Sequence, residues 1–296
     1  MADWLTVRTE DGRDLEVVRS GQPDANPLVW YGGTPTEGSE IPPHVSRAVT
    51  EGGWQVVSYS RPGYAGSTVQ PDRTVADAAA DTVAVLDHLG INRFVALGWS
   101  GGGPHALACA ALLPGRCSAA ATLASVAPYD AEGLDWLDGM ARENQEEFGA
   151  AVESVDALTA YLEKQAPGLA NVTGDEVTAA LGGLVSDVDR SAVTGELADS
   201  LAAMFRRAVS GGIAGWRDDD LAFVKDWGFD LSAITTPVSI WQGQQDRMVP
   251  FAHGRWLATH IPGARLHLYA DQGHLSLFPQ MPRITDDLEV LANARG

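Results

Sequence analysis

Five residues, Gly98-Trp99-Ser100-Gly101-Gly102, form a pattern that can place a nucleophilic serine on a sharp turn. They follow an apolar run that predicts a strand over residues 94–98 and precede an alanine-rich run that predicts a helix ending before Pro114. The flanking glycines remove side chains that would collide where a strand turns directly into a helix. We expect Ser100 to stand exposed there as a nucleophile; the alternative is a glycine-rich turn with a bystander serine.

A serine hydroxyl is a weak nucleophile at neutral pH and needs a base, normally a histidine that a carboxylate orients. After an elbow of this kind the acid comes next in the chain and the histidine last. Asp246 lies on the loop after the predicted strand 238–242, and we prefer it as the acid over Asp130 or an ordinary turn residue. His274 lies on a glycine-bearing loop after the predicted strand 264–269, whereas the other six histidines fall on predicted helices, helix ends or a strand. His274 is therefore the expected base.

Acyl transfer also requires hydrogen-bond donors for the oxyanion. We expect one from the backbone N–H of Gly101, at the start of the helix. The second should come from the loop that follows the predicted strand 28–31, where small residues let the backbone approach the reacting carbonyl. Thr34 is the preferred donor and Gly33 the next; the alternative is a plain Gly-Pro turn.

The elements that must position these residues alternate between short β-branched or aromatic runs and helical patterns, separated by Gly and Pro. A helix is expected from a capping box of Thr74 and Asp77 to a stop at Gly90. The pattern predicts an α/β fold with a mostly parallel sheet flanked by helices. The predicted strands cover residues 14–19, 28–31, 55–59, 94–98, 119–124, 238–242 and 264–269.

The middle of the chain differs from both flanks in charge and in pattern. Residues 129–236 hold 21 acidic and 7 basic side chains, and helical patterns such as 157–165 and 197–209 replace the strands. This predicts a helical insertion at 129–230 within a core domain formed by residues 1–128 and 231–296.

Composition bounds the possible functions. The chain has 296 residues, 45% of them hydrophobic, and a net charge of −19 that repels nucleic acids and anionic membranes. Cys109 and Cys117 stand among apolar residues as small hydrophobes, which fits a reducing cytoplasm. The chain starts without a leader pattern, and no apolar run is long enough to cross a bilayer, so we expect a soluble cytoplasmic protein. No metal-ligand cluster is present, and the expected chemistry requires no metal or organic cofactor.

Together these motifs make the sequence resemble the α/β-hydrolase fold family, in particular cap-bearing members related to epoxide hydrolases, haloperoxidases and proline iminopeptidases. Residues 32–35 are similar to the family's H-G-x-P loop, with Gly32 in the place of the histidine. That departure implies a looser oxyanion loop. The run Arg61-Pro62-Gly63-Tyr64-Ala65-Gly66-Ser67 is similar to the family's glycine-rich loop, and the segments around Asp246 and His274 complete the match.

The resemblance implies that the helical insertion is a cap over the catalytic face. Large apolar side chains that could line its pocket are Trp99, Trp136, Met140, Met204 and Phe205, with Phe148, Trp216 and Phe223, although such residues often only pack. Acidic cap residues facing the pocket would favour a substrate bearing an amine.

The expected activity is cleavage of a small-molecule carboxylic ester, lactone or thioester through an acyl-enzyme on Ser100. Family members with an aspartate nucleophile, such as epoxide hydrolases and haloalkane dehalogenases, are disfavoured as models of the activity. The alternatives are an iminopeptidase-like aminopeptidase, and a noncatalytic ligand receptor or cofactorless oxygenase on the same fold. The sequence does not indicate the oligomeric state.

Overall fold

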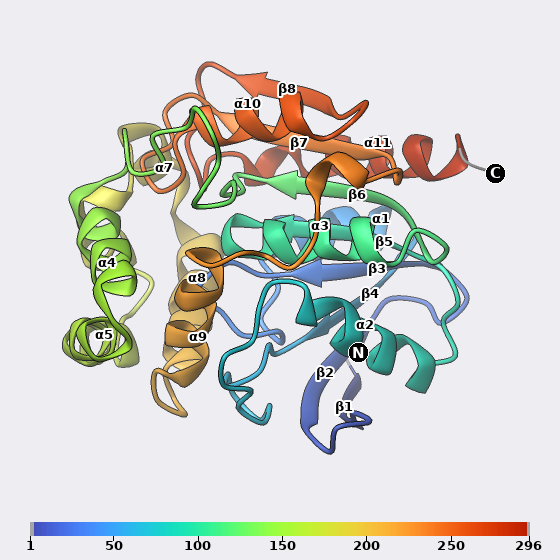
Figure 1. Ribbon diagram of the computed structural model, residues 1–296, viewed down its shortest axis with the longest axis horizontal. Helices are drawn as coiled ribbons and strands as arrows, with labels where there is room; N and C mark the ends of the chain where they lie inside the picture. Colours follow the sequence, from blue (N-terminus) through green and yellow to red (C-terminus); the bar gives the residue numbers. More distant parts are fainter. Residues whose placement is uncertain (1–2, 295–296) are drawn as a thin grey trace.

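The computed structural model describes residues 3–294, which form one eight-stranded sheet with helices on both faces (Figure 1). The strand order is β1-β2-β4-β3-β5-β6-β7-β8; β1, β2 and β4 pair antiparallel and all later pairs are parallel. The strands are β1 (Asp3–Arg8), β2 (Asp14–Ser20), β3 (Asn26–Tyr31), β4 (Trp54–Tyr59), β5 (Phe94–Trp99), β6 (Cys117–Leu123), β7 (Val238–Gly243) and β8 (Arg265–Tyr269). The predicted α/β fold with a mostly parallel sheet is confirmed.

The seven predicted strands are all present, with ends that differ by at most two residues, and β1 is an additional strand. Most of its side chains are exposed because it lies at the edge of the sheet and pairs only with β2. The sequence therefore carries no continuous apolar run there. In contrast, every residue of β4, β5, β6 and β7 is buried, as expected for strands covered on both faces.

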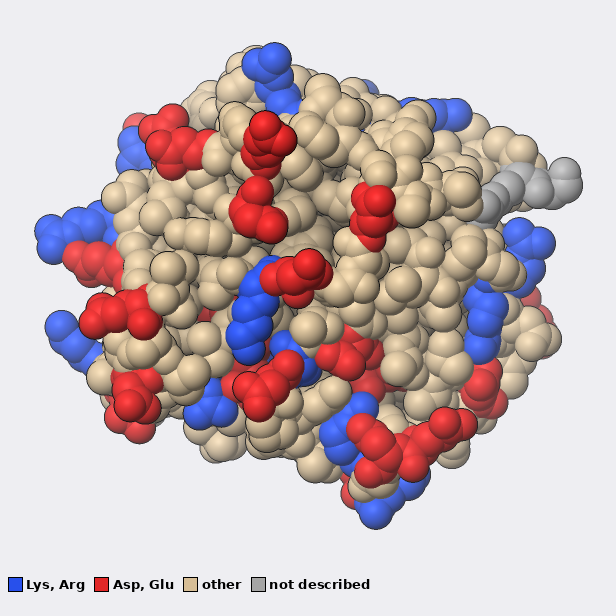
Figure 2. Space-filling view, viewed as in Figure 1, with Lys and Arg blue, Asp and Glu red and all other residues tan. Residues whose placement is uncertain are grey.

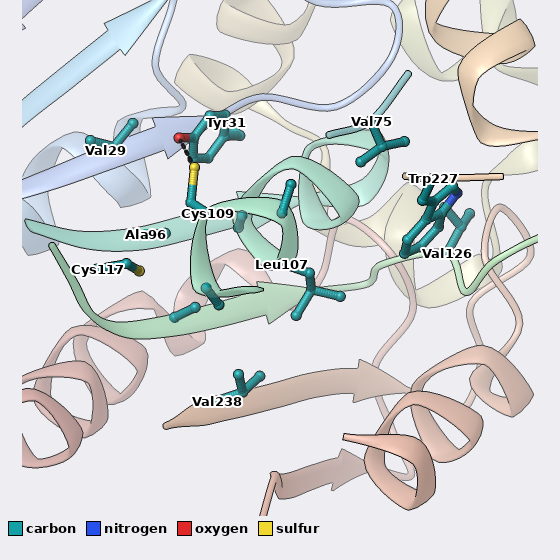
Figure 3. Close-up of a cluster of buried hydrophobic side chains, with 14 of the residues drawn as sticks. Val29, Tyr31, Val75, Ala96, Leu107, Cys109, Cys117, Val126, Trp227 and Val238 are labelled. Carbon is teal, nitrogen blue, oxygen red and sulfur yellow. Dashed lines mark hydrogen bonds between the residues drawn. The ribbon is translucent and has the colours of Figure 1, made fainter. Parts of the chain in front are cut away.

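Two layers of helices cover the sheet. One face is covered by α1 (Pro43–Glu51) and α11 (Met281–Asn293), and the other by α2 (Asp77–His88), α3 (Gly103–Leu112) and α10 (Phe251–His260). Figure 3 shows the core beneath α3, where the Tyr31 hydroxyl lies 3.0 Å from the sulfur of Cys109. Cys109 and Cys117 are both buried and free of disulfides, as small hydrophobic residues of this core.

The start of α2 differs from the sequence expectation. Thr74 and Asp77 do interact, because the backbone N–H of Thr74 donates to the Asp77 carboxylate at 2.6 Å. The helix itself begins only at Asp77, so Thr74 is not the N-cap and the expected capping box is wrong. The stop at Gly90 is present, with a positive φ of 69° that suits glycine.

All remaining α-helices lie between β6 and β7, and they gather at one end of the sheet, on the left in Figure 1. We call them the inserted helices. On the face drawn in Figure 2, acidic side chains are interspersed with basic ones. Within residues 3–294, no helix is both long and apolar enough to cross a membrane. The inserted helices are α4 (Arg142–Glu153), α5 (Val155–Ala170), α6 (Val177–Ala180), α7 (Asp187–Ala192), α8 (Gly195–Ala208) and α9 (Ala214–Phe223).

Candidate active site

Ser100 stands on a strained turn between β5 and α3. Its φ is +55°, a left-handed conformation that residues with a side chain seldom adopt. Gly98 is required beneath it, because a Cβ there would collide with the backbone of Gly102 and Gly103. The strand, a short 3₁₀ turn over Ser100–Gly102 and the helix follow without a break. The backbone is therefore that of the expected nucleophile elbow.

Asp246 and His274 meet at the carboxyl ends of β7 and β8. The Nδ1 atom of His274 lies 2.8 Å from Oδ2 of Asp246, and both side chains are buried. The other oxygen of Asp246 accepts the backbone N–H groups of Met248 and Val249, at 2.9 and 2.8 Å. These bonds fix the carboxylate, which in turn fixes the ring of His274 with Nδ1 toward the acid.

The second ring nitrogen of His274, Nε2, has no hydrogen-bond partner in the part of the chain that the structure describes. Burial raises the pKa of Asp246, and the neighbouring His274 only partly offsets that effect. Among the described residues, no group forms a hydrogen bond with Nε2 of His274, although the atom is buried. His274 and Ser100 line the same cavity, of about 230 Å³. A buried imidazole whose Nε2 has no hydrogen-bond partner among the described residues therefore lines the same cavity as the serine.

The loop after β3 packs directly against the elbow. A Cβ on Gly33 would lie 3.1 Å from Cβ of Ser100, and one on Gly101 would lie 2.5 Å from Oγ1 of Thr34. Larger residues at either glycine would push the two segments apart. Gly33, Thr34 and Gly101 all line the cavity. The structure therefore brings the three expected oxyanion residues around the serine.

The missing histidine at Gly32 is compensated by Arg61. Its guanidinium donates to the carbonyl of Gly32 at 2.7 Å and to that of Gly33 at 2.8 Å. A buried arginine from the loop after β4 therefore braces this loop, where the resemblance implied a histidine at position 32. Arg61 belongs to the glycine-rich run noted in the sequence. Its role could not be predicted there, because the carbonyls that it binds lie 28 and 29 residues earlier in the chain.

Arg61 is itself held by Asp219, which α9 contributes from the inserted helices. Asp219 is fully buried and pairs with Arg61 at 2.6 Å and with Arg73 at 2.7 Å. It also accepts hydrogen bonds from the hydroxyl groups of Thr34, at 2.8 Å, and Tyr64, at 2.9 Å. Burial alone would raise the pKa of Asp219, but the charges of Arg61 and Arg73 outweigh it and hold the pKa well below its usual range. The inserted helices are thus tied to the loop after β3 that carries Thr34.

Five of the eight apolar candidates line the cavity: Trp99, Phe148, Phe205, Trp216 and Phe223. Trp136, Met140 and Met204 do not, which corrects the expectation for these three. They lie in packed hydrophobic cores, and the indole N–H of Trp136 donates to the carbonyl of Ala127 at 2.7 Å. Helical spacing alone does not separate a core face from a cavity wall.

Sequence reasoning missed Asp189, which lies on α7. This carboxylate is fully buried and accepts the backbone N–H groups of three consecutive residues: His274 at 3.0 Å, Leu275 at 2.8 Å and Ser276 at 2.9 Å. Burial would raise the pKa of Asp189, but these bonds and one from the Ser186 hydroxyl lower it below the usual value. Asp189 thus fixes the backbone of the loop that carries the histidine. Its only sequence signal was a Ser186 three residues before an acid.

Replacing Asp189 with Asn should lower kcat/KM by about 10- to 100-fold, because a misplaced base loses reactive geometry. Removing a negative charge near the imidazolium should also shift the acid limb of the pH–rate profile to lower pH. Steady-state kinetics across pH checks both effects. Asp187→Asn, on the exposed side of the same helix, is the matched control. An unchanged profile in the Asp189 variant would assign it a purely structural role.

Comparisons with known proteins decide the family. The model of the alpha/beta hydrolase fold matches residues 26–280. The chain belongs to the α/β-hydrolase fold family. This hydrolase is 27% identical over 234 residues to the uncharacterized hydrolase YcgS of Bacillus subtilis, covering 77% of this chain and 78% of the relative.

This hydrolase is also similar to proteins with named activities. It is 27% identical over 197 residues to a 2-hydroxy-6-oxononadienedioate/2-hydroxy-6-oxononatrienedioate hydrolase of Cupriavidus pinatubonensis, covering 64% of this chain and 58% of that one. An esterase structure from Exiguobacterium antarcticum superposes with a TM-score of 0.68 at 18% identity, over 97% of this chain and 98% of the esterase. At 18% identity, the similarity to this esterase shows a shared fold.

Proposed function

We propose that the protein is a serine hydrolase that cleaves a small-molecule carboxylic ester through an acyl-enzyme on Ser100. The observation that carries the proposal is the buried Asp246–His274 pair at 2.8 Å, whose free Nε2 shares a cavity with a serine at φ +55°. The family and its esterase-like neighbours support the same class of reaction.

In the proposed mechanism Oγ of Ser100 attacks the ester carbonyl while Nε2 of His274 takes the hydroxyl proton. Asp246 keeps the imidazole in the required tautomer and stabilises the imidazolium. The backbone N–H groups of Gly101 and Thr34 hold the oxyanion of the tetrahedral intermediate. The protonated His274 then gives its proton to the leaving alcohol. Water, activated by the same histidine, hydrolyses the acyl-enzyme.

We further propose that residues 129–230 act as a cap over a core of residues 1–128 and 231–296. The cavity wall supports this division, because it combines core residues such as Ser100 and His274 with Phe148, Phe205 and Trp216 from α4, α8 and α9. The apolar wall suits the acyl or alcohol part of a small ester. Two buried cysteines that form no disulfide are compatible with a cytoplasmic location.

The test is intact-mass analysis after treatment with a fluorophosphonate, which labels activated serines. A single adduct is expected on the parent protein and none on Ser100→Ala. Ester hydrolysis should disappear with the adduct. An unlabelled parent protein that also leaves esters intact would contradict the proposal and favour a ligand receptor on the same fold.

A further inference from the structure

The cavity beside Ser100 has an unusual charge balance. Three acidic side chains lie on its wall, Glu143, Glu147 and Asp220, and within residues 3–294 no Lys or Arg lines it. All three come from the inserted helices α4 and α9. An apolar cavity of this kind ordinarily holds few charged groups, each matched to a feature of the ligand.

Asp220 lacks a donor of its own. The residue is 1% exposed, and apart from the neighbouring carboxyl of Glu147 no described group forms a hydrogen bond with either of its carboxyl oxygens. The nearby arginines bind other acids: Arg73 pairs with Asp219 and Arg217 with Asp218. A buried carboxylate without a donor is costly to the fold. Folding alone therefore gives no reason for an acid at this position.

Glu147 completes an acidic pair with Asp220. One of its oxygens accepts the indole N–H of Trp216 at 2.7 Å, which holds the carboxyl at the cavity wall. Burial raises the pKa of Asp220, and the adjacent Glu147 raises it further. Burial also raises the pKa of Glu147. Two carboxyls this close compete for one proton, and a cation between them would relieve their repulsion.

We infer that Glu147 and Asp220 form a subsite for a protonated amine on the substrate, which deepens the proposed function and rests on it. An ammonium group supplies N–H donors to the carboxyl oxygens of Asp220 and neutralises the charge of the pair. The rest of the substrate lies against the apolar wall, with its ester carbonyl at Ser100. A carboxylate in the same place would meet two acids and no cation. The hydrolase therefore selects amine-bearing esters and rejects acyl chains that end in a carboxylate.

The first experiment measures binding without turnover. n-Butylammonium, 1-butanol and butyrate are compared as ligands by calorimetry and by protection of Ser100 from fluorophosphonate. The parent protein should bind butylammonium at least 10-fold more tightly than butanol, and butyrate most weakly. Asp220→Asn and Glu147→Gln should each remove most of this preference. Glu146→Gln, the same change one position away and off the cavity wall, should retain it.

Stability provides an independent control on folding. Asn at position 220 has the size of Asp and no charge to bury, so Asp220→Asn should melt at or above the temperature of the parent. A large fall in melting temperature would instead show that Asp220 serves the fold, which contradicts the subsite. Equal binding of butylammonium and butanol by the parent would overturn it as well.

The kinetic experiment separates this inference from the proposed function. Matched aryl esters with neutral, ammonium-bearing and carboxylate-bearing acyl chains are compared by kcat/KM. Hydrolysis of the neutral ester without preference for the ammonium ester removes the subsite and leaves the serine hydrolase. Selective binding of butylammonium by a protein that fluorophosphonate does not label removes the hydrolase and leaves an amine-binding site.

Discussion

His274→Ala should lower kcat for ester hydrolysis by about 10⁴- to 10⁶-fold, and Ser100→Ala should lower it by a similar factor. In the proposed mechanism the two groups act in one step, because the serine oxygen becomes a nucleophile only as the imidazole removes its proton. The double variant should therefore be no slower than either single variant. Steady-state kinetics with an activated aryl ester checks all three proteins.

The matched control is His260→Ala, which removes an exposed histidine from the end of α10 and should leave kcat within about twofold of the parent. Asp246→Asn should cost about 10³- to 10⁴-fold, since an amide favours the wrong tautomer of His274. If the single losses multiplied in the double variant, Ser100 and His274 would act independently, and the proposed relay would be wrong.

Asp219→Ala should lower the free energy of unfolding by about 3–5 kcal/mol, since it leaves Arg61 and Arg73 buried without their counter-charge. It also removes the acceptor of the Thr34 hydroxyl, so the oxyanion loop loses a link and kcat should fall with stability. Urea denaturation gives the first quantity and ester kinetics the second. Asp226→Ala, an exposed acid beyond α9, is the control and should change stability by less than about 0.5 kcal/mol.

The contribution of Asp219 should depend on pH in a defined direction. Its pKa in the folded protein lies well below the usual value, so the folded state holds the charged form more strongly than the unfolded state does. The stabilisation is complete above the unfolded pKa of about 4 and is lost as the pH falls through the folded pKa. Parent and variant should therefore differ most near neutrality and converge in strong acid. A constant difference across this range would show that packing, not charge, explains the loss.

The sequence by itself determined the elements that carry the chemistry. The five-residue elbow and the strand before it are local patterns, and the order of acid and histidine that is typical of such an elbow then selects the loops of Asp246 and His274. The parallel order of the strands follows from the alternation of strand and helix, and parallel strands bring their carboxyl ends to one edge. Three residues far apart in the chain could for that reason be predicted to meet.

Only the tertiary structure decided how those residues are supported and what surrounds them. Arg61, Asp219 and Asp189 act on backbone groups or charges that lie 29 to 158 residues away, so no local pattern shows which groups they bind. Trp136 and Phe148 are both large and apolar, and they pack against each other in one core cluster, yet only Phe148 also reaches the cavity wall. Burial and hydrogen bonding depend on which segments face each other, and that is fixed by packing rather than by local sequence.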